Sequence, residues 1–124
     1  MSTMPNHTVL VVDDNDDIRM ALQELLESEG YATAAAENGE AALSWLHGEE
    51  ARPCMILLDY NMPVMDGPTF RKRQQADAAL AEIPVILYSG ADDIRRRAHA
   101  LDVMHVFQKP LNLNTLVELV RRYC

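Results

Sequence analysis

Apolar residues along this chain are gathered in short runs that end at polar or turn-forming residues. Three runs are apolar almost throughout, at Thr8–Val12, Cys54–Leu58 and Ile83–Tyr88. Such runs are typical of strands that are buried on both faces of a sheet. Two weaker segments, Tyr31–Ala35 and Val103–Phe107, complete the set. The pattern therefore predicts five strands.

The segments between these runs have helical spacing instead. In the first of them, apolar residues recur at i, i+4, i+7 and i+8 and would share one face: Ile18, Leu22, Leu25 and Leu26. Asn15 or Asp16 is suited to cap the start of this helix, and Gly30 to end it. The sequence thus indicates an amphipathic helix between the first two strands.

Four further helices are predicted from their start signals. These signals are Asn38-Gly39, Pro68, the pair Asp92-Asp93, and Asn112 or Asn114. Strands that alternate with helices predict an α/β fold, a three-layer sandwich with a parallel sheet and right-handed crossovers. We expect residues 1–124 to form a single domain, with residues 1–7 as an N-terminal arm.

Composition narrows the functional classes. A net charge of −8 disfavours nucleic-acid binding and is compatible with a cation site. The N-terminus lacks the features of a signal peptide, and no apolar run is long enough to cross a membrane. The two cysteines, Cys54 and Cys124, are judged badly placed to pair, which favours a reducing, cytoplasmic location.

The polar residues that could carry chemistry fall where strands end. Asp13 and Asp14 follow the first strand, Asp59 the third, Ser89 the fourth and Lys109 the fifth. Ligands of open parallel sheets bind at this edge. Each residue alone has a plain structural reading, as a helix cap, a turn residue or a solvated lysine. Their convergence on one edge favours a joint site over these separate roles.

Three carboxylates in one cleft repel each other, and a hard divalent cation would relieve this repulsion. Mg²⁺ prefers oxygen ligands and is often shared with a phosphate group. The ammonium of Lys109 and the hydroxyl of Ser89 are suited to phosphoryl oxygens. A carboxylate nucleophile beside a metal and a cation is the arrangement for an aspartyl-phosphate intermediate.

With these motifs in order, the chain resembles the receiver domains of two-component response regulators, the family that includes the single-domain chemotaxis regulators. The resemblance extends from Thr8 to Tyr123. It rests on four motifs, each weak alone and highly specific together: Val12-Asp13-Asp14; Leu58-Asp59 with Met62-Pro63 and Met65-Asp66-Gly67; Ser89-Gly90-Ala91; and Lys109-Pro110.

The resemblance implies a flavodoxin-like strand order of 2-1-3-4-5 and a function. Asp59 would be the phosphoacceptor, taking a phosphoryl group from a histidine kinase or a histidine phosphotransfer protein. The product would then act on a downstream protein target, so the chain is expected to be a signalling protein and not an enzyme, although its aspartyl phosphate could hydrolyse itself. No nucleic acid or membrane is expected as a partner.

The resemblance also implies roles for the neighbours of Asp59. Asp14 and Asp59 would bind Mg²⁺ through their carboxylates, Asp13 through a water molecule and Asn61 through its backbone carbonyl. Ser89 and Lys109 would hold the phosphoryl oxygens. The Lys109–Pro110 peptide bond would be cis.

The chain departs from the family pattern on the side that transmits the signal. Val106 stands where the family usually has Tyr or Phe, and Phe107 should face the other side of its strand. Asp102 replaces a common glycine, and the third helix is unusually polar after Phe70. The side chains of Arg95–Arg97 are expected to face solvent, and contact with a partner protein is the alternative.

Other classes stay in view beside the receiver reading. A haloacid-dehalogenase-type aspartyl phosphatase needs a second aspartate two positions after the first, and here that position is Asn61. A pure binding module that uses the receiver fold without phosphorylation is disfavoured, because the full set of Asp13, Asp14, Asp59, Ser89 and Lys109 is present. A receiver piece of a hybrid histidine kinase is a further alternative, although the start at Met1 and the lack of a linker after Arg122 favour a free-standing regulator.

Overall fold

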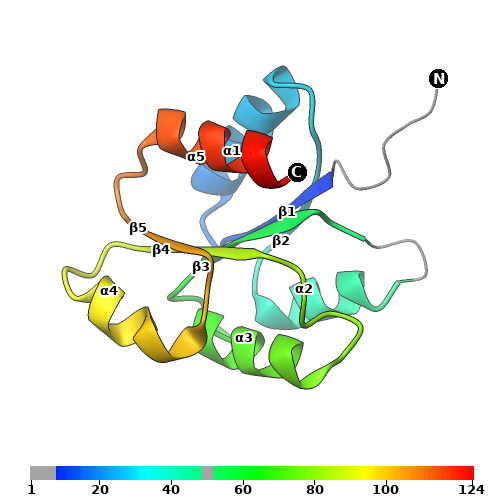
Figure 1. Cartoon of the computed structure of the whole chain (residues 1–124), viewed down its shortest axis with the longest axis vertical. Coiled ribbons are helices and arrows are strands. Elements are labelled where there is room, and N and C mark those ends of the chain that lie inside the picture. Colours follow the sequence, from blue (N-terminus) through cyan, green and yellow to red (C-terminus); the bar gives the residue numbers. More distant parts are fainter. Residues whose placement is uncertain (1–7, 49–51) are drawn as a thin grey trace.

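A computed structural model describes residues 8–48 and 52–124 of the chain. It is a five-stranded parallel sheet with helices on both faces (Figure 1). The strands are β1 (Thr8–Val12), β2 (Ala32–Ala36), β3 (Met55–Asp59), β4 (Val85–Ser89) and β5 (His105–Gln108). The helices are α1 (Asp16–Ser28), α2 (Gly39–Leu46), α3 (Gly67–Ala76), α4 (Ile94–Arg97), the 3₁₀ segment η1 (Ala98–Leu101) and α5 (Leu113–Tyr123).

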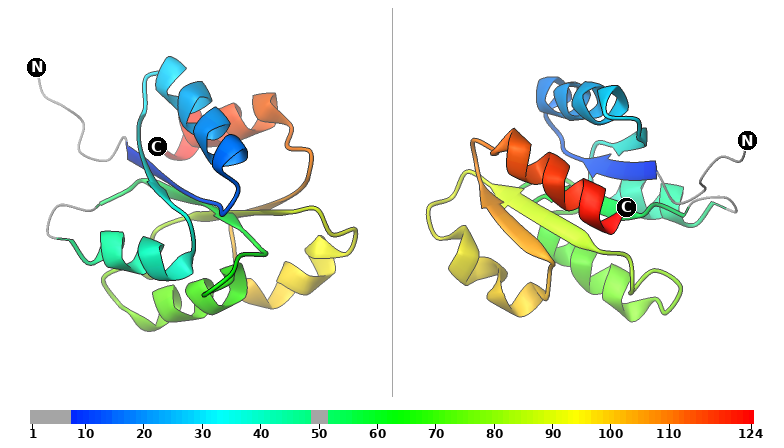
Figure 2. Two further views of the ribbon diagram at one scale, coloured as in Figure 1. Left: turned by 180° about the vertical axis from the view of Figure 1, so that it is seen from behind. Right: turned by 45° about the horizontal axis from the view of Figure 1, so that its top comes forward.

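The strand order is β2-β1-β3-β4-β5, which confirms the expected flavodoxin-like topology. Helices α1 and α5 cover one face, and α2, α3 and α4 cover the other (Figures 1 and 2). Because side chains alternate along a strand, β1, β3, β4 and β5 each contribute to both layers of core, whereas the edge strand β2 contributes only to the layer under α2, α3 and α4. Leu10, Ile56 and Leu87 pack toward α2, α3 and α4, whereas Val11 and Leu57 pack toward α1 and α5.

Helix α3 packs against the core although its sequence is unusually polar. Arg71 and Gln74 are buried with Phe70, but their polar atoms reach backbone carbonyls. The Arg71 guanidinium donates to the carbonyls of Leu101 at 2.9 Å and of Asp102 at 2.6 Å. The Gln74 amide donates to the Leu80 carbonyl at 2.9 Å and to that of Ile83 at 3.0 Å. Buried polar groups with partners thus replace part of an apolar stripe.

The fourth helix is short and only partly α-helical. It is α-helical only over Ile94–Arg97 and tightens into η1, which is followed by Asp102 with a φ of 53°. The Asp93 side chain does not cap the helix and instead pairs with Arg96 and Arg97. The N-caps of α1 and α5 are the predicted Asn15 and Asn112, and Gly30 follows the end of α1 with a φ of 96°.

The expectation that the cysteines are badly placed to pair is wrong. Cys54 and Cys124 form a disulfide with a Cα–Cα separation of 5.3 Å. Helix α5 runs back along the sheet, so Cys124, which directly follows it, reaches the amino end of β3, just after Cys54 (Figure 2). The inference of a reducing location, which assumed unpaired cysteines, therefore loses its basis.

Two remaining sequence expectations concern membranes and the N-terminal arm. Within the described residues no helix has the length and apolarity that a membrane span requires. The expected arm, residues 1–7, lies outside the described part of the chain.

Candidate functional site

The candidate site lies at the carboxyl edge of the sheet, where β1 and β3 are neighbours. Asp13 directly follows β1, and Asp59 is the last residue of β3. One carboxylate oxygen from each of Asp13, Asp14 and Asp59 lies within 4.8 Å of the others. Lys109 brings the opposite charge, with its Nζ 3.6 Å from Oδ1 of Asp59. The structure thus brings these four predicted side chains together.

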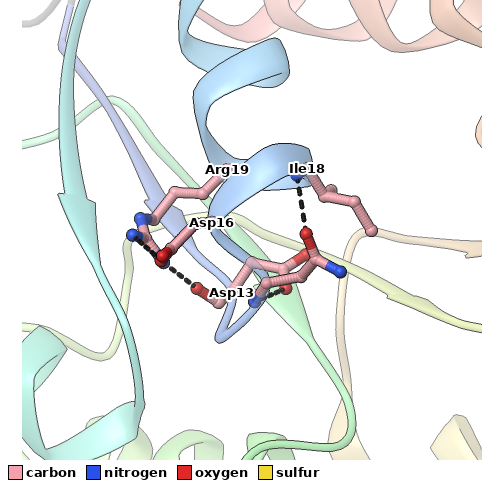
Figure 3. A network of polar contacts seen from close by, with 5 residues as sticks. Asp13, Asp16, Ile18 and Arg19 are labelled. Carbon is pink, nitrogen blue, oxygen red and sulfur yellow. Dashed lines mark hydrogen bonds and ion pairs between the residues drawn. The ribbon is translucent and has the colours of Figure 1, made fainter.

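The loop from β1 to α1 is held by its own hydrogen bonds (Figure 3). The Asp13 Oδ1 accepts from the Asn15 backbone N–H at 2.8 Å, and the Asn15 Oδ1 accepts from the Ile18 N–H at 3.0 Å. Arg19 donates to the Asp13 carbonyl at 2.7 Å and to the carboxylate of Asp16. With these contacts Asp13 is buried at the carboxyl edge of the sheet, whereas Asp14 is exposed.

Burial makes Asp59 an unusual acid. Its side chain is only 5% exposed. Burial, followed by the nearby charge of Asp13, raises the pKa of Asp59 from 3.8 to about 7. The Lys109 ammonium and the backbone N–H of Asn61 act in the opposite direction on this pKa. Near neutral pH, the residue is therefore poised between its protonated and ionised forms.

Ser89 is the last residue of β4, which neighbours β3, and Lys109 directly follows β5, the next strand outward. The Lys109 N–H donates to the Ser89 carbonyl at 2.7 Å, which ties the ends of β4 and β5 together. The Ser89 side chain is fully buried, and its Oγ accepts from the Ala91 N–H at 3.1 Å. Ser89 therefore also has the turn role that its sequence allows. The Lys109–Pro110 bond is cis, as expected.

Asn61 lies beside the acidic residues, in the loop between β3 and α3. A shallow depression of about 350 Å³ is lined by Asp14, Asn61, Met62, Pro63 and Asp66. The loop turns back so closely onto β3 that a Cβ at Gly67 would lie 2.7 Å from the Asp59 carbonyl oxygen. Glycine at this position is what lets α3 start directly beside Asp59.

One residue of this edge, Tyr88, was not singled out from the sequence. It precedes Ser89 on β4, and its hydroxyl donates to Oδ2 of Asp13 at 2.9 Å. Burial, with the charge of Asp13, raises the pKa of Tyr88 well above its usual value, so it remains a neutral donor. A tyrosine inside a buried strand needs a hydrogen-bond partner for its hydroxyl, and this was the available signal.

The position that usually holds an aromatic residue has a different environment here. Val106 is half-buried and packs toward the α2, α3 and α4 face. Phe107 faces the opposite layer, as predicted, where it packs with Tyr88. The His105 ring lies 4.5 Å from that of Phe107, and burial lowers the pKa of His105. The aromatic side chains of this region therefore lie on the α1 and α5 side of the sheet.

The donor set fits a hard divalent cation. Carboxylate oxygens from three strand-end residues lie close together, and Asp14 keeps the cluster open to solvent. Mg²⁺ prefers such all-oxygen sites with a few carboxylates and several waters. Of the four histidines, His47 and His99 are exposed and His105 is half-buried, whereas His7 lies outside the described residues.

Comparison with known proteins places this geometry in context. The response regulator receiver domain family matches residues 9–121. The sporulation initiation phosphotransferase F of Bacillus subtilis is 32% identical over 120 residues, which cover 97% of this chain and 95% of that protein.

Solved structures agree. A response regulator receiver protein from Pseudomonas putida has a TM-score of 0.85 at 32% identity, covering 93% of this chain and 95% of its own. A receiver domain of a Syntrophus aciditrophicus signal transduction histidine kinase has a TM-score of 0.84 at 30% identity, covering 94% and 89% respectively. The chain belongs to the response regulator receiver domain family of two-component signalling.

Proposed function

We propose that this protein is a phosphoacceptor switch, phosphorylated on Asp59 in a Mg²⁺-dependent reaction. One observation carries the proposal. The clustered carboxylates of Asp13, Asp14 and Asp59 lie at the carboxyl edge of the sheet, with the Lys109 Nζ 3.6 Å from Asp59. A structural ion pair alone would not need three acids at one point.

In the proposed reaction an ionised carboxylate oxygen of Asp59 attacks the phosphorus of a phosphohistidine. A new O–P bond forms while the N–P bond breaks, and its electron pair returns to the imidazole nitrogen. When bound, Mg²⁺ neutralises negative charge on the carboxylates and on the phosphoryl group. Asp14 and Asp59 would bind it through carboxylates, Asn61 through its backbone carbonyl and Asp13 through water.

Lys109 and Ser89 act on the phosphoryl group from the other side. The Lys109 ammonium already pairs with Asp59 and is suited to a phosphoryl oxygen once the new bond has formed. The Ser89 Oγ accepts one hydrogen bond, so its own O–H remains available to donate. Movement of these two side chains is how phosphorylation would change the protein surface.

The phosphoryl donor is proposed to be a histidine kinase or a histidine phosphotransfer protein. An apolar groove of about 520 Å³ lies next to Lys109, between α1 and the loop that follows β5, and suits an apolar helix face of such a donor. Ile18, Ala21, Leu22, Pro110, Leu111 and Leu113 line it together with Lys109. A partner seated there has its reactive side chain near the acidic edge.

Receiver domains act mainly as phosphoacceptors, without enzymatic turnover as their main role. We therefore infer that the phosphorylated form signals by binding a downstream protein, in the cytoplasm where histidine kinases use ATP. Slow hydrolysis of its own aspartyl phosphate would return it to the starting state. The likeness to a receiver domain of a histidine kinase keeps a second arrangement in view, in which this domain works as part of a hybrid kinase.

Phosphotransfer from a protein donor tests the proposal. Purified histidine kinases, each autophosphorylated with radiolabelled ATP, are mixed with the wild-type chain and with Asp59→Asn in the presence of Mg²⁺. We expect at least one kinase to pass its label rapidly to the wild type and not to Asp59→Asn. Rapid transfer to both proteins would contradict the assignment of Asp59.

A further inference from the structure

Tyr88 contacts the candidate site from the core layer on the α1 and α5 side of the sheet. It is the second-to-last residue of β4 and is 1% exposed, in the core layer under α1 and α5. Asp13 follows β1, and β3 lies between β1 and β4. Neighbouring strands are about 4.8 Å apart, so a β4 side chain must be long to reach across β3 to Asp13. Tyrosine has this length, an apolar body that suits the core, and a polar tip.

The hydroxyl of Tyr88 completes the hydrogen bonding of Asp13. The Oδ2 of Asp13 accepts from Tyr88 at 2.9 Å, and its Oδ1 accepts from the Asn15 N–H at 2.8 Å. Asp13 is 0% exposed, so protein donors, and not bulk water, set the orientation of its carboxylate. Each oxygen accepts one of these two hydrogen bonds, which leaves further lone pairs for a cation or its waters.

The ring of the same tyrosine lies beside the cation of the site. The Lys109 Nζ is 5.4 Å from the centroid of the Tyr88 ring, within the range of a cation–π contact. One buried side chain therefore supports Asp13 through its hydroxyl and Lys109 through its ring.

We propose that Tyr88 is a positioning residue for Mg²⁺, which acts by holding the Asp13 carboxylate in its binding orientation. The inference rests on the proposed function, because it assumes that the carboxylate cluster binds Mg²⁺. Hydrogen bonds from supporting residues fix the direction of a metal-binding group before the metal arrives, and their loss at direct ligands typically weakens metal binding about 10- to 100-fold. Because Asp13 would bind Mg²⁺ through a water molecule, we expect an effect at the low end of this range.

The test measures Mg²⁺ affinity by calorimetric titration with Mg²⁺ alone, without any phosphodonor. Tyr88→Phe keeps the ring and removes only the hydroxyl. Tyr123→Phe removes the same atom from a half-exposed residue at the end of α5 and is the matched control. We expect the Kd for Mg²⁺ to rise about 10-fold in Tyr88→Phe and to stay within twofold of wild type in Tyr123→Phe.

A second pair of variants shows whether the effect passes through Asp13. In an Asp13→Asn background, titrated until each variant is saturated, Tyr88→Phe should change the Kd less than twofold. An equal 10-fold loss in that background would mean that the substitution merely disturbs the core, and would overturn the proposal.

The outcomes also separate this inference from the proposed function. If the wild type binds Mg²⁺ and Tyr88→Phe binds it equally well, the role of Tyr88 is wrong and the metal site stands. If the wild type itself does not bind Mg²⁺, the metal-dependent function fails and the inference fails with it.

Discussion

Asp59 is the residue whose environment most constrains the chemistry of this protein. It is buried beside Asp13 and only partly compensated by Lys109, so its charged form is disfavoured when no cation is bound. The same burial that destabilises the carboxylate keeps water away from it and strengthens every interaction with a cation. The site therefore lowers the stability of the metal-free folded protein and favours the binding of a cation.

This cost predicts how metal-free stability depends on pH. Because the pKa of Asp59 is raised from 3.8 to about 7 in the folded state, the folded protein holds more protons than the unfolded chain between these values. The free energy of unfolding should thus fall as pH rises through this window, by at most about 1.4 kcal/mol per pH unit from this group.

Urea unfolding from pH 4.5 to 8 in the presence of EDTA measures this effect. Comparison with Asp59→Asn isolates the contribution of Asp59, and that variant should lose the corresponding part of the slope. Asp17→Asn, on the exposed first turn of α1, is the control and should keep it. A wild type and an Asp59→Asn variant with the same pH dependence would show that Asp59 ionises normally.

At the scale of elements, the alternation of strands and helices was predictable, because buried runs and helical spacing are local patterns. The N-caps Asn15 and Asn112 were likewise readable from the sequence. The partners of Arg71 were not, since the carbonyls that it reaches belong to residues about 30 positions away. The short α4 was not predicted either, although its contacts are local: Asp93 pairs with Arg96 and Arg97, on the next turn, instead of capping the helix.

Arg71 should be important for joining α3 to the end of η1. Arg71→Met keeps most of the aliphatic stem but leaves the carbonyls of Leu101 and Asp102 without their donor. We expect a loss of about 2 to 4 kcal/mol in the free energy of unfolding, because buried acceptors become unpaired. Arg73→Met, on the exposed face of the same helix, should change it by less than about 0.5 kcal/mol.

Urea denaturation of both variants measures these differences. Equal, small effects of the two substitutions would mean that the buried guanidinium contributes nothing net to stability.

At the scale of the whole molecule, the sequence was sufficient to predict which strand ends converge, because the carboxyl ends of parallel strands share one edge. It did not predict what meets at the opposite edge. Cys54 and Cys124 come together there because α5 returns along the sheet, a consequence of packing that neither cysteine's local sequence contains. Tyr88 was missed for the same reason, since its partner Asp13 follows β1, a strand that is not adjacent to β4.

The disulfide predicts a redox-dependent stability. It links residues 70 positions apart. In the chain-entropy treatment, a cross-link of this span lowers the entropy of the unfolded chain and so raises the free energy of unfolding by about 4 kcal/mol. A reductant should lower the free energy of unfolding of the wild type toward that of Cys124→Ser, which should itself not respond to the reductant. Unfolding curves that are identical with and without reductant would show that the bond does not form in solution.

The most direct test of the central claim is intact-mass spectrometry after incubation with a small phosphodonor. With Mg²⁺, the wild type should gain one phosphoryl group that hydroxylamine removes, and chelation of the metal should prevent the gain. Asp66→Asn, which alters a neighbouring acid at the start of α3, should still be labelled, whereas Asp59→Asn should not. Undiminished labelling of Asp59→Asn would contradict the account.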